Sequence, residues 1–481
     1  MTRRPHVILI ISDQHARAIM GCQGDPYIRS PHLDSLAEGA VRCTAAYAPS
    51  PLCVPSRMAM LCGRMPMDNG IHHNSQTLAS HVPTIAHSMA AAGYRTVLCG
   101  RMHFVGPDQR HGYHHRLVGD HTRTSPALRE MPMGLFDGST GQDGRCLDHS
   151  GAGRSTVMAY DEAVTNAACQ YLASHHSDEP LFLTVGYYGP HNPYVCDRER
   201  FAYYQRLLPL PDAQELSAWQ EIDHPAMRAW RTARHLHDLD PVQLHTARAA
   251  YYGACETIDD HIGQVVTAAH THGHGDNLLL IYLSDHGDLA GERGLFWKSC
   301  MYEGSVGVPW LLRWDGHLRP GTINDPVSLL DLAPTLAALV DAPQLPGASG
   351  RDLSPALHGG SLPPADVIST LSDHRCGPTA MIRRGPWKLI LHHDHDTGEL
   401  YQLDEDPGER INRWSDADCA SIRDAMVTTV RQYWDPERVL AQARLAREQL
   451  ALLRAADHAY PTPDGDDDWQ GNLDELWLDR D

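Results

Sequence analysis

The sequence has no excess of basic charge and no long apolar run. Of its 481 residues, 40 are Lys or Arg and 60 are Asp or Glu, which gives a formal net charge of −20 at pH 7. No apolar stretch approaches the roughly 20 residues that a membrane-spanning helix needs. A chain without a basic stripe is not expected to bind the phosphate backbone of nucleic acids. We therefore expect neither a membrane nor a nucleic acid as partner.

The 12 cysteines are scattered, with no C-x-x-C pair and no clustered zinc-binding spacing. Near the N-terminus, the apolar stretch 7–11 is too short for the hydrophobic region of a signal peptide, and Asp13 interrupts the apolar pattern. We therefore predict a first strand there rather than an export signal. Reduced cysteines and a cytoplasmic location are the corresponding expectation.

Four short apolar runs alternate with helix-like segments, and no internal repeat interrupts this pattern. The runs are continuous rather than alternating, as is typical of strands that are buried on both faces. They cover residues 7–11, 95–99, 181–186 and 278–283. This pattern predicts an α/β fold, with a mostly parallel sheet sandwiched by helices.

The composition changes after about residue 350, which predicts a division of the chain. We expect a catalytic domain over 1–365, a smaller C-terminal α+β domain with antiparallel strands over 366–434, and a helix with an acidic tail over 435–481. Residues 381–393 are typical of a hairpin, and Asp435-Pro436 is typical of a helix start. An apolar seam follows on that helix, formed by Val439, Ala443, Ala446, Leu450 and Leu453. We expect this seam either to pack on its own domain or to form an oligomer contact.

Polar side chains follow each of the four apolar runs. Because the carboxyl ends of parallel strands meet at one edge of a sheet, these groups should converge. Carboxylates, an amide and an imidazole among them suit a hard divalent cation such as calcium, magnesium or manganese. The converging residues are Asp13, Gln14, Arg101, His103, His191 and those of the segment Asp285-His286-Gly287-Asp288.

The segment 50–64 adds a fifth element to this edge. Pro55 fits the first turn of a helix that Gly63 would end, which places Cys53 at the positive end of the helix dipole. Free amides, the dipole and Arg57 together make an anion pocket. A buried, inert cysteine is the alternative interpretation of Cys53.

Cys53-Val54-Pro55-Ser56-Arg57 matches the C-x-P-S-R motif of type I sulfatases, members of the alkaline-phosphatase-like superfamily. The similarity covers about residues 5–415. It includes AGYRTVLCGRMHF (92–104), GPHNPY (189–194) and SDHGDLAGERGLFWKSCMYEGSVGVP (284–309). The stretch GRMHFVGPDQRHGY (100–113) resembles bacterial choline sulfatases, which are cytoplasmic and oligomeric. The resemblance therefore also implies a homo-oligomer.

The resemblance implies a role for each matching position. Cys53 would be oxidised to formylglycine by a dedicated maturation enzyme. One divalent ion, with Ca²⁺ favoured over Mg²⁺ or Mn²⁺, would be held by Asp13, Gln14, Asp285 and His286. The groups that hold sulfate oxygens or transfer protons would be Arg57, Arg101, His103, His191 and Lys298, and Asn74 would contact the sulfate region. Two positions depart from the family pattern, Arg101 where Lys is usual and Cys62 where Thr is usual.

These roles predict a sulfuric ester hydrolase whose nucleophile is the formylglycine hydrate. A Ser nucleophile would end as a stable sulfate ester, whereas the second hydroxyl of an aldehyde hydrate can expel sulfate. The predicted substrate is choline sulfate or another small or sugar sulfate. Two alternatives stay open: a phosphonate monoester or phosphodiester hydrolase on the same scaffold, and a non-catalytic binding protein with an unmodified Cys53.

Overall fold

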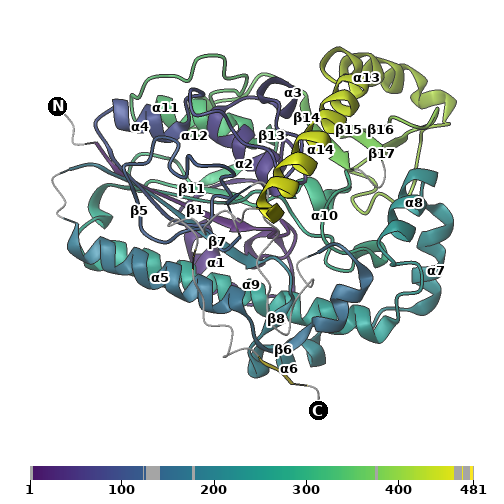
Figure 1. Cartoon of the computed structure of the whole chain (residues 1–481), viewed down its shortest axis with the longest axis horizontal. Coiled ribbons are helices and arrows are strands. Elements are labelled where there is room, and N and C mark those ends of the chain that lie inside the picture. Colours follow the sequence, from purple (N-terminus) through teal and green to yellow (C-terminus); the bar gives the residue numbers. More distant parts are fainter. Residues whose placement is uncertain are drawn as a thin grey trace.

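The computed structural model describes residues 4–122, 124–125, 141–175, 179–373, 377–459, 469 and 477–479. Its centre is an eight-stranded sheet (Figure 1). In spatial order the strands are β12 (Gly321–Ile323), β2 (Val41–Cys43), β11 (Trp310–Arg313), β9 (Leu278–Ser284), β1 (His6–Asp13), β7 (Leu181–Pro190), β4 (Arg95–Gly100) and β5 (His115–Arg116).

The predicted mostly parallel sheet is confirmed. β1 pairs in parallel with both β7 and β9, and β7 and β5 pair in parallel with β4. β11 is antiparallel to β9 and to β2. The four apolar runs of the sequence form the adjacent strands β9, β1, β7 and β4, so their carboxyl ends lie side by side.

Helices cover both faces of the sheet, as the continuous apolar runs predict. Val7, Leu9 and Ile11 of β1 belong to one buried cluster, with α2 (Cys53–Cys62), α4 (Ile85–Ala91) and α11 (Leu332–Leu339). Ile8 and Ile10 belong to the cluster of the opposite face, with α1 (Pro31–Glu38), α5 (Thr156–Ser174) and α9 (Pro241–Thr271). Figure 1 shows α5 and α9 on one side of the sheet and α2, α4 and α11 on the other.

Shorter elements surround this core. They are β3 (Ala46–Tyr47), α3 (Pro66–Asn69), β6 (Gly151–Arg154), β8 (Val195–Cys196), α6 (Arg198–Leu207), α7 (Ala213–Ile222), α8 (Pro225–Ala233), α10 (Glu303–Val306), β10 (Gly307–Val308), β13 (Val327–Ser328), α12 (Ser354–Leu357) and β18 (Trp477–Leu478).

A second, antiparallel sheet lies towards the C-terminus. Its strands are β14 (Val367–Asp373), β15 (Gly377–Arg384), β16 (Trp387–His392) and β17 (Glu399–Gln402), followed by α13 (Ala420–Tyr433) and α14 (Pro436–Ala459). The predicted hairpin over 381–393 is confirmed, because Arg384 pairs with Trp387. The predicted helix start is confirmed too, since Asp435 Oδ1 accepts the amide hydrogen of Arg438 at 3.0 Å.

The apolar seam of α14 is buried only in its first turns. Val439 and Ala443 are 2% and 3% exposed, whereas Leu453 is 46% exposed. The seam therefore packs on its own chain at its start and faces outwards further along. Of the acidic tail, only residues 469 and 477–479 are among those described. Within the described part of the chain, none of the helices combines the length and the apolar character needed to cross a bilayer.

Helix α2 has the ends that the sequence predicts. Pro55 lies in its first turn, and Gly63 ends it with a left-handed φ of 67°. A Cβ atom built on Gly63 would lie 2.7 Å from the Cβ of Ala348. Gly63 is therefore required both by its backbone conformation and by the close approach of the segment that contains Ala348.

We predict that Gly63→Ala destabilises the protein more than Gly70→Ala. Gly70 also has a left-handed φ, of 76°, but nothing lies within 4 Å of its added Cβ. Gly70→Ala should cost only the left-handed strain of about 1–2 kcal/mol, while overpacking adds about 1–3 kcal/mol at Gly63. Urea unfolding of both variants measures the difference. Equal losses would contradict the close contact with Ala348.

Candidate functional site

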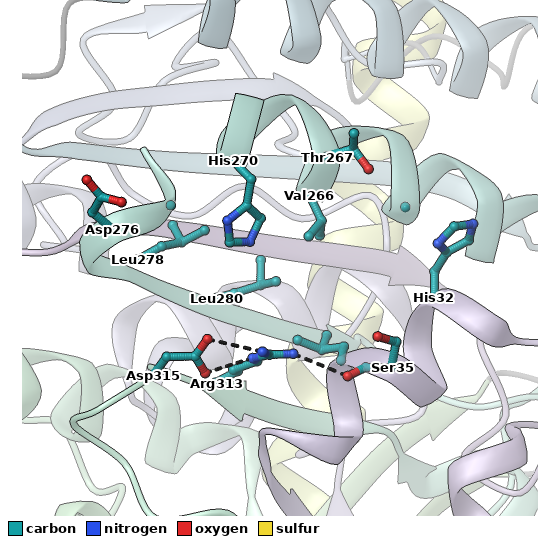
Figure 2. A pocket seen from close by; sticks show the side chains of 13 residues that line it. His32, Ser35, Val266, Thr267, His270, Asp276, Leu278, Leu280, Arg313 and Asp315 are labelled. Atoms are coloured by element: carbon teal, nitrogen blue, oxygen red, sulfur yellow. Dashed lines mark hydrogen bonds and ion pairs between the residues drawn. The ribbon is translucent and has the colours of Figure 1, made fainter. Parts of the chain in front are cut away.

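The predicted site residues gather at the carboxyl ends of β1, β4, β7 and β9. Asp13 ends β1 and Asp285 directly follows β9, while Cys53 opens α2 at the same edge. All three side chains are buried. A cavity of about 210 Å³, shown in Figure 2, lies elsewhere: it is lined by Leu278, at the opposite end of β9, and by side chains of α1 and α9.

Two buried carboxylates share one guanidinium. Arg57 donates through Nη2 to Asp13 Oδ2 at 3.1 Å and through Nε to Asp285 Oδ2 at 2.7 Å. The Oδ1 atoms of both carboxylates lie 3.6 Å from His286 Nε2. Together with Cys53 Sγ, these potential ligand atoms lie within 4.8 Å of one another. Arg57 therefore turns one oxygen of each carboxylate towards a common point.

This donor set fits a hard divalent cation. Two carboxylate oxygens face each other in a buried space, and an oxygen-rich set with one imidazole suits Ca²⁺, Mg²⁺ or Mn²⁺. Burial raises the pKa of Asp13, but Arg101 and Arg57 outweigh burial and hold that pKa well below its ordinary value. Asp13 is therefore ionised, as a metal ligand must be.

Gln14 is fixed by three neighbours of the same edge. Its Nε2 donates to Asp288 Oδ2 at 2.5 Å, its Oε1 accepts from Lys298 Nζ, and its backbone amide donates to Asp285 Oδ1 at 3.1 Å. Gln14 adopts a left-handed φ of 71°. The backbone amide of Gln14 therefore contacts the carboxylate pair, while its side-chain amide is held by Asp288 and Lys298. The left-handed backbone conformation costs energy for a residue with a side chain.

Cys53 lies between the carboxylates and a lysine. Its Sγ is 3.2 Å from His286 Nε2 and 3.5 Å from Lys298 Nζ. Burial and Asp13 raise the pKa of the thiol to about 11, because Lys298 and Arg101 only partly offset them. The unmodified side chain is therefore a protonated thiol at neutral pH, which is a weak nucleophile.

Arg101 connects Asp13 to His103. Its Nε donates to Asp13 Oδ2 at 2.6 Å, and its Nη2 donates to His103 Nδ1 at 2.9 Å. Because Nδ1 accepts, the hydrogen of the neutral His103 ring lies on Nε2. Burial and Arg101 lower the pKa of His103 to about 3. The ring of Tyr188 lies under the guanidinium, with 4.3 Å from the guanidinium carbon to the ring centroid.

His191 and Asn74 complete the predicted set. His191 Nδ1 bonds to the carbonyl oxygen of Asn192 at 2.7 Å, so the lone pair of the neutral ring lies on Nε2. Burial and Lys298 hold the pKa of His191 well below its ordinary value. Asn74 Oδ1 accepts the amide hydrogen of Val54 at 3.1 Å, which satisfies one free amide at the start of α2.

Two buried aspartates, which were given no role from the sequence, support the site. Asp120 accepts hydrogen bonds from Arg101 Nη1 at 3.2 Å and from the backbone amide of His103 at 2.7 Å. Asp288 accepts from Gln14, as above, and from Tyr194 at 2.5 Å. Asp288 was visible as part of the segment 285–288, whereas no sequence signal marked Asp120 as a partner of Arg101.

Comparisons with known proteins find relatives over most of the chain. The family model described as Sulfatase matches residues 5–342, and the one described as N-sulphoglucosamine sulphohydrolase, C-terminal, matches 291–435. The chain is 30% identical to the choline-sulfatase of Rhizobium meliloti (strain 1021) over 461 residues, covering 92% of this chain and 89% of that protein.

Solved structures share the fold. The phosphonate monoester hydrolase of Agrobacterium radiobacter superposes with a TM-score of 0.73 at 22% identity, covering 89% of this chain and 95% of its own. A putative sulfatase from Bacteroides thetaiotaomicron superposes with a TM-score of 0.69 at 21% identity, covering 96% of this chain and 95% of its own. The predicted α/β fold with a C-terminal addition is thus confirmed.

We predict that His103 makes the protein less stable in acid. Its pKa of about 3 in the folded state lies below its ordinary value of 6.5, so below pH 6.5 the unfolded chain binds a proton that the folded chain excludes. Stability is therefore lost as pH falls from 6.5 towards 3, by up to about 1.4 kcal/mol per pH unit. In urea unfolding between pH 7 and 5, His103→Gln should reduce the slope of stability against pH by up to this amount. Asn74→Ala alters the site without removing a titrating group and should leave the slope unchanged. An unchanged slope for His103→Gln would contradict the burial of a neutral imidazole.

Proposed function

Because the chain belongs to the sulfatase family and is an enzyme that hydrolyses sulfate esters, we propose that it uses a formylglycine made from Cys53 together with one divalent cation. The single observation that carries this proposal is the position of Cys53. Its Sγ lies at the start of α2, within 4.8 Å of ligand atoms of Asp13, Asp285 and His286.

Asp13, Gln14, Asp285 and His286 would hold the cation, with Ca²⁺ the first choice for a site rich in oxygen. When bound, the ion supplies Lewis-acid stabilisation of negative charge on oxygen. Arg57 would hold the two carboxylates in the orientation that the cation needs, because it donates hydrogen bonds of 3.1 and 2.7 Å to Asp13 and Asp285.

Formylglycine supplies, as its hydrate, a hydroxyl nucleophile and a second hydroxyl through which sulfate can later be released. The chain's own cations would bind the sulfate oxygens: Arg57, Arg101 and Lys298. Preorganised positive groups in a buried site stabilise the charge that develops on a transferring group. Lys298 lies 3.5 Å from Cys53 Sγ, which suits this role.

His191 and His103 would handle the protons. His191 presents the lone pair of Nε2, and its low pKa stems from burial and from Lys298. A bound sulfate offsets the charge of Lys298, so Nε2 can take up a proton and give it to the leaving oxygen as general acid. His103, whose Nε2 carries the hydrogen, would assist the release of sulfate, and Asn74 would border the sulfate region.

For the substrate we propose a small sulfate monoester, with choline sulfate first and sugar sulfates second. The support is the choline-sulfatase relative at 30% identity over 92% of this chain. Hydrolysis of a panel of choline, aryl and sugar sulfates by the mature enzyme tests this assignment. A preference for a sugar sulfate of more than about tenfold in kcat/KM would reverse the order.

The resemblance to bacterial choline sulfatases supports the proposed location and oligomer. We assign a cytoplasmic location, a homo-oligomer, and a formylglycine-generating enzyme as partner during maturation. We also retain the division of the chain near residue 365, since the antiparallel sheet begins at Val367. Fractionation, light scattering and limited proteolysis test these assignments separately.

We predict that Cys53→Ala abolishes sulfate ester hydrolysis while leaving the fold intact, because the variant lacks the precursor of the nucleophile. Cys62→Ala, on the same helix and equally buried, should retain most activity and serves as the control. Initial rates on an aryl sulfate, after expression with the maturation enzyme, measure the effect. Mass spectrometry of the peptide around residue 53 should show sulfur replaced by an aldehyde oxygen.

Two outcomes would favour the alternatives. An unmodified thiol at Cys53 after expression with the maturation enzyme, together with no hydrolysis, would favour a binding protein. Faster turnover of a phosphonate monoester than of the matched sulfate ester would favour the phosphonate hydrolase.

We predict that Asp120→Asn lowers kcat/KM by about 10- to 100-fold, because Arg101 and His103 lose the anion that positions them. Asp120 is a positioning residue, so kcat should fall more than KM rises, and the pH profile of kcat/KM should change. Asp108→Asn, in the segment between β4 and β5 and partly exposed, is the control. Equal effects of the two substitutions would contradict the role of Asp120.

A further inference from the structure

A second cluster of metal-binding side chains lies away from the catalytic edge. His224 directly precedes α8, His392 ends β16 and Glu399 opens β17. All three are buried, and their ligand atoms lie within 4.8 Å of one another. None of them has a part in the proposed hydrolysis. The histidine-rich stretch 392–396 of the sequence thus has one member inside the fold, facing a histidine from a distant segment.

The donor atoms lie close together. His392 Nε2 lies 2.8 Å from Glu399 Oε1. The rings of His224 and His392 are stacked, with centroids 4.7 Å apart and an interplanar angle of 14°. His224 Nε2 lies 3.0 Å from the hydroxyl of Thr397, in the turn between β16 and β17. Two imidazoles and one carboxylate thus meet between α8 and the β16–β17 hairpin.

Glu399 is held as metal-ligating carboxylates usually are. The hydroxyls of Tyr302 and Tyr401 donate to its Oε2 at 2.8 and 2.6 Å. These bonds fix the carboxylate and leave Oε1 turned towards His392. Outer hydrogen bonds of this kind orient the ligands of protein metal sites.

We propose that His224, His392 and Glu399 form a second metal site, which binds a zinc-class transition ion and ties α8 to the β16–β17 hairpin. Two imidazoles and one carboxylate suit Zn²⁺, whereas hard ions such as Ca²⁺ prefer oxygen ligands. The ion takes the place of the hydrogen that lies between His392 Nε2 and Glu399 Oε1, and that hydrogen moves to His392 Nδ1, so that the ring stays a neutral ligand. On His224 the ring hydrogen moves from Nε2 to Nδ1, at the loss of one 3.2 Å bond from the Ala226 amide.

The site is accessible to an ion. His392 also lines a cavity of about 850 Å³, together with His395 and Thr397. The ring of His395 lies 5.1 Å from that of His224. The fourth position of a tetrahedral ion can therefore be filled by water or by His395.

Zinc binding to the full-length chain tests the proposal. The experiment uses the Asp13→Asn background, which disables the catalytic metal site, with thiols blocked and metals removed by a chelator. Calorimetric titration with Zn²⁺ should give one ion per chain, and Co²⁺ should give the visible absorption of a tetrahedral site. Zn²⁺ should also raise the melting temperature of this protein.

Two substitutions within the cluster should remove the site. His224→Asn keeps a side chain that can cap α8 and removes only the first imidazole. His392→Gln removes the second imidazole of the cluster. Each substitution should weaken Zn²⁺ binding by more than about tenfold. Even the loss of a residue that only hydrogen-bonds to a metal ligand lowers metal affinity about 10- to 100-fold. His393→Gln is the control, since His393 pairs with Glu437 at 3.2 Å outside the cluster.

Unchanged zinc affinity in His224→Asn, or no binding in the Asp13→Asn parent, would overturn the proposal. The melting temperature of each metal-free variant shows whether it has folded. Because the catalytic site is disabled in every sample, the outcome is independent of the proposed hydrolysis.

Discussion

The ion pair of Arg57 with Asp13 and Asp285 is the interaction on which the rest of the site depends. The two carboxylates come from the ends of neighbouring strands, and the guanidinium comes from α2, so this pair fixes the helix against the sheet. All three side chains are fully buried. Burying charges is costly unless they are paired with good geometry, so such a cluster contributes more to positioning than to stability. Its benefit is that one oxygen of each carboxylate already points to the same place.

Arg101, where the family usually has Lys, extends this cluster. Its three nitrogens reach three different partners, namely Asp13, His103 and Asp120. A lysine ammonium is a point charge on a flexible stem and cannot hold these groups in one plane. The substitution therefore keeps the positive charge near the site and adds a rigid link from β1 to His103. Although the chain has a net charge of −20, buried cations thus gather where the proposed sulfate would bind.

Much of this arrangement could be predicted from the sequence, for physical reasons. Strands buried on both faces need continuous apolar runs, which is why 7–11 and 278–283 are visible as β1 and β9. Their adjacent carboxyl ends then bring Asp13 and Asp285 together. Asp120 could not be predicted, because its role depends on how far the side chain of Arg101 reaches. The cluster of His224 and Glu399 was equally invisible, since it arises from packing between distant segments. The roles assigned to the individual site residues remain predictions.

The environment of Cys53 favours the proposed modification over a lowered thiol pKa as the source of the nucleophile. To act as a thiolate at neutral pH, Cys53 would need a lowered thiol pKa. Burial and Asp13 instead raise that pKa to about 11, although Lys298 lies 3.5 Å from the sulfur. The carboxylates that add to the effect of burial are the ones proposed to hold the cation, so they cannot be removed to activate the sulfur. The proposed aldehyde hydrate offers what a thiol lacks, a second hydroxyl through which sulfate can be released, and a cation held by the same carboxylates would stabilise negative charge on its oxygen.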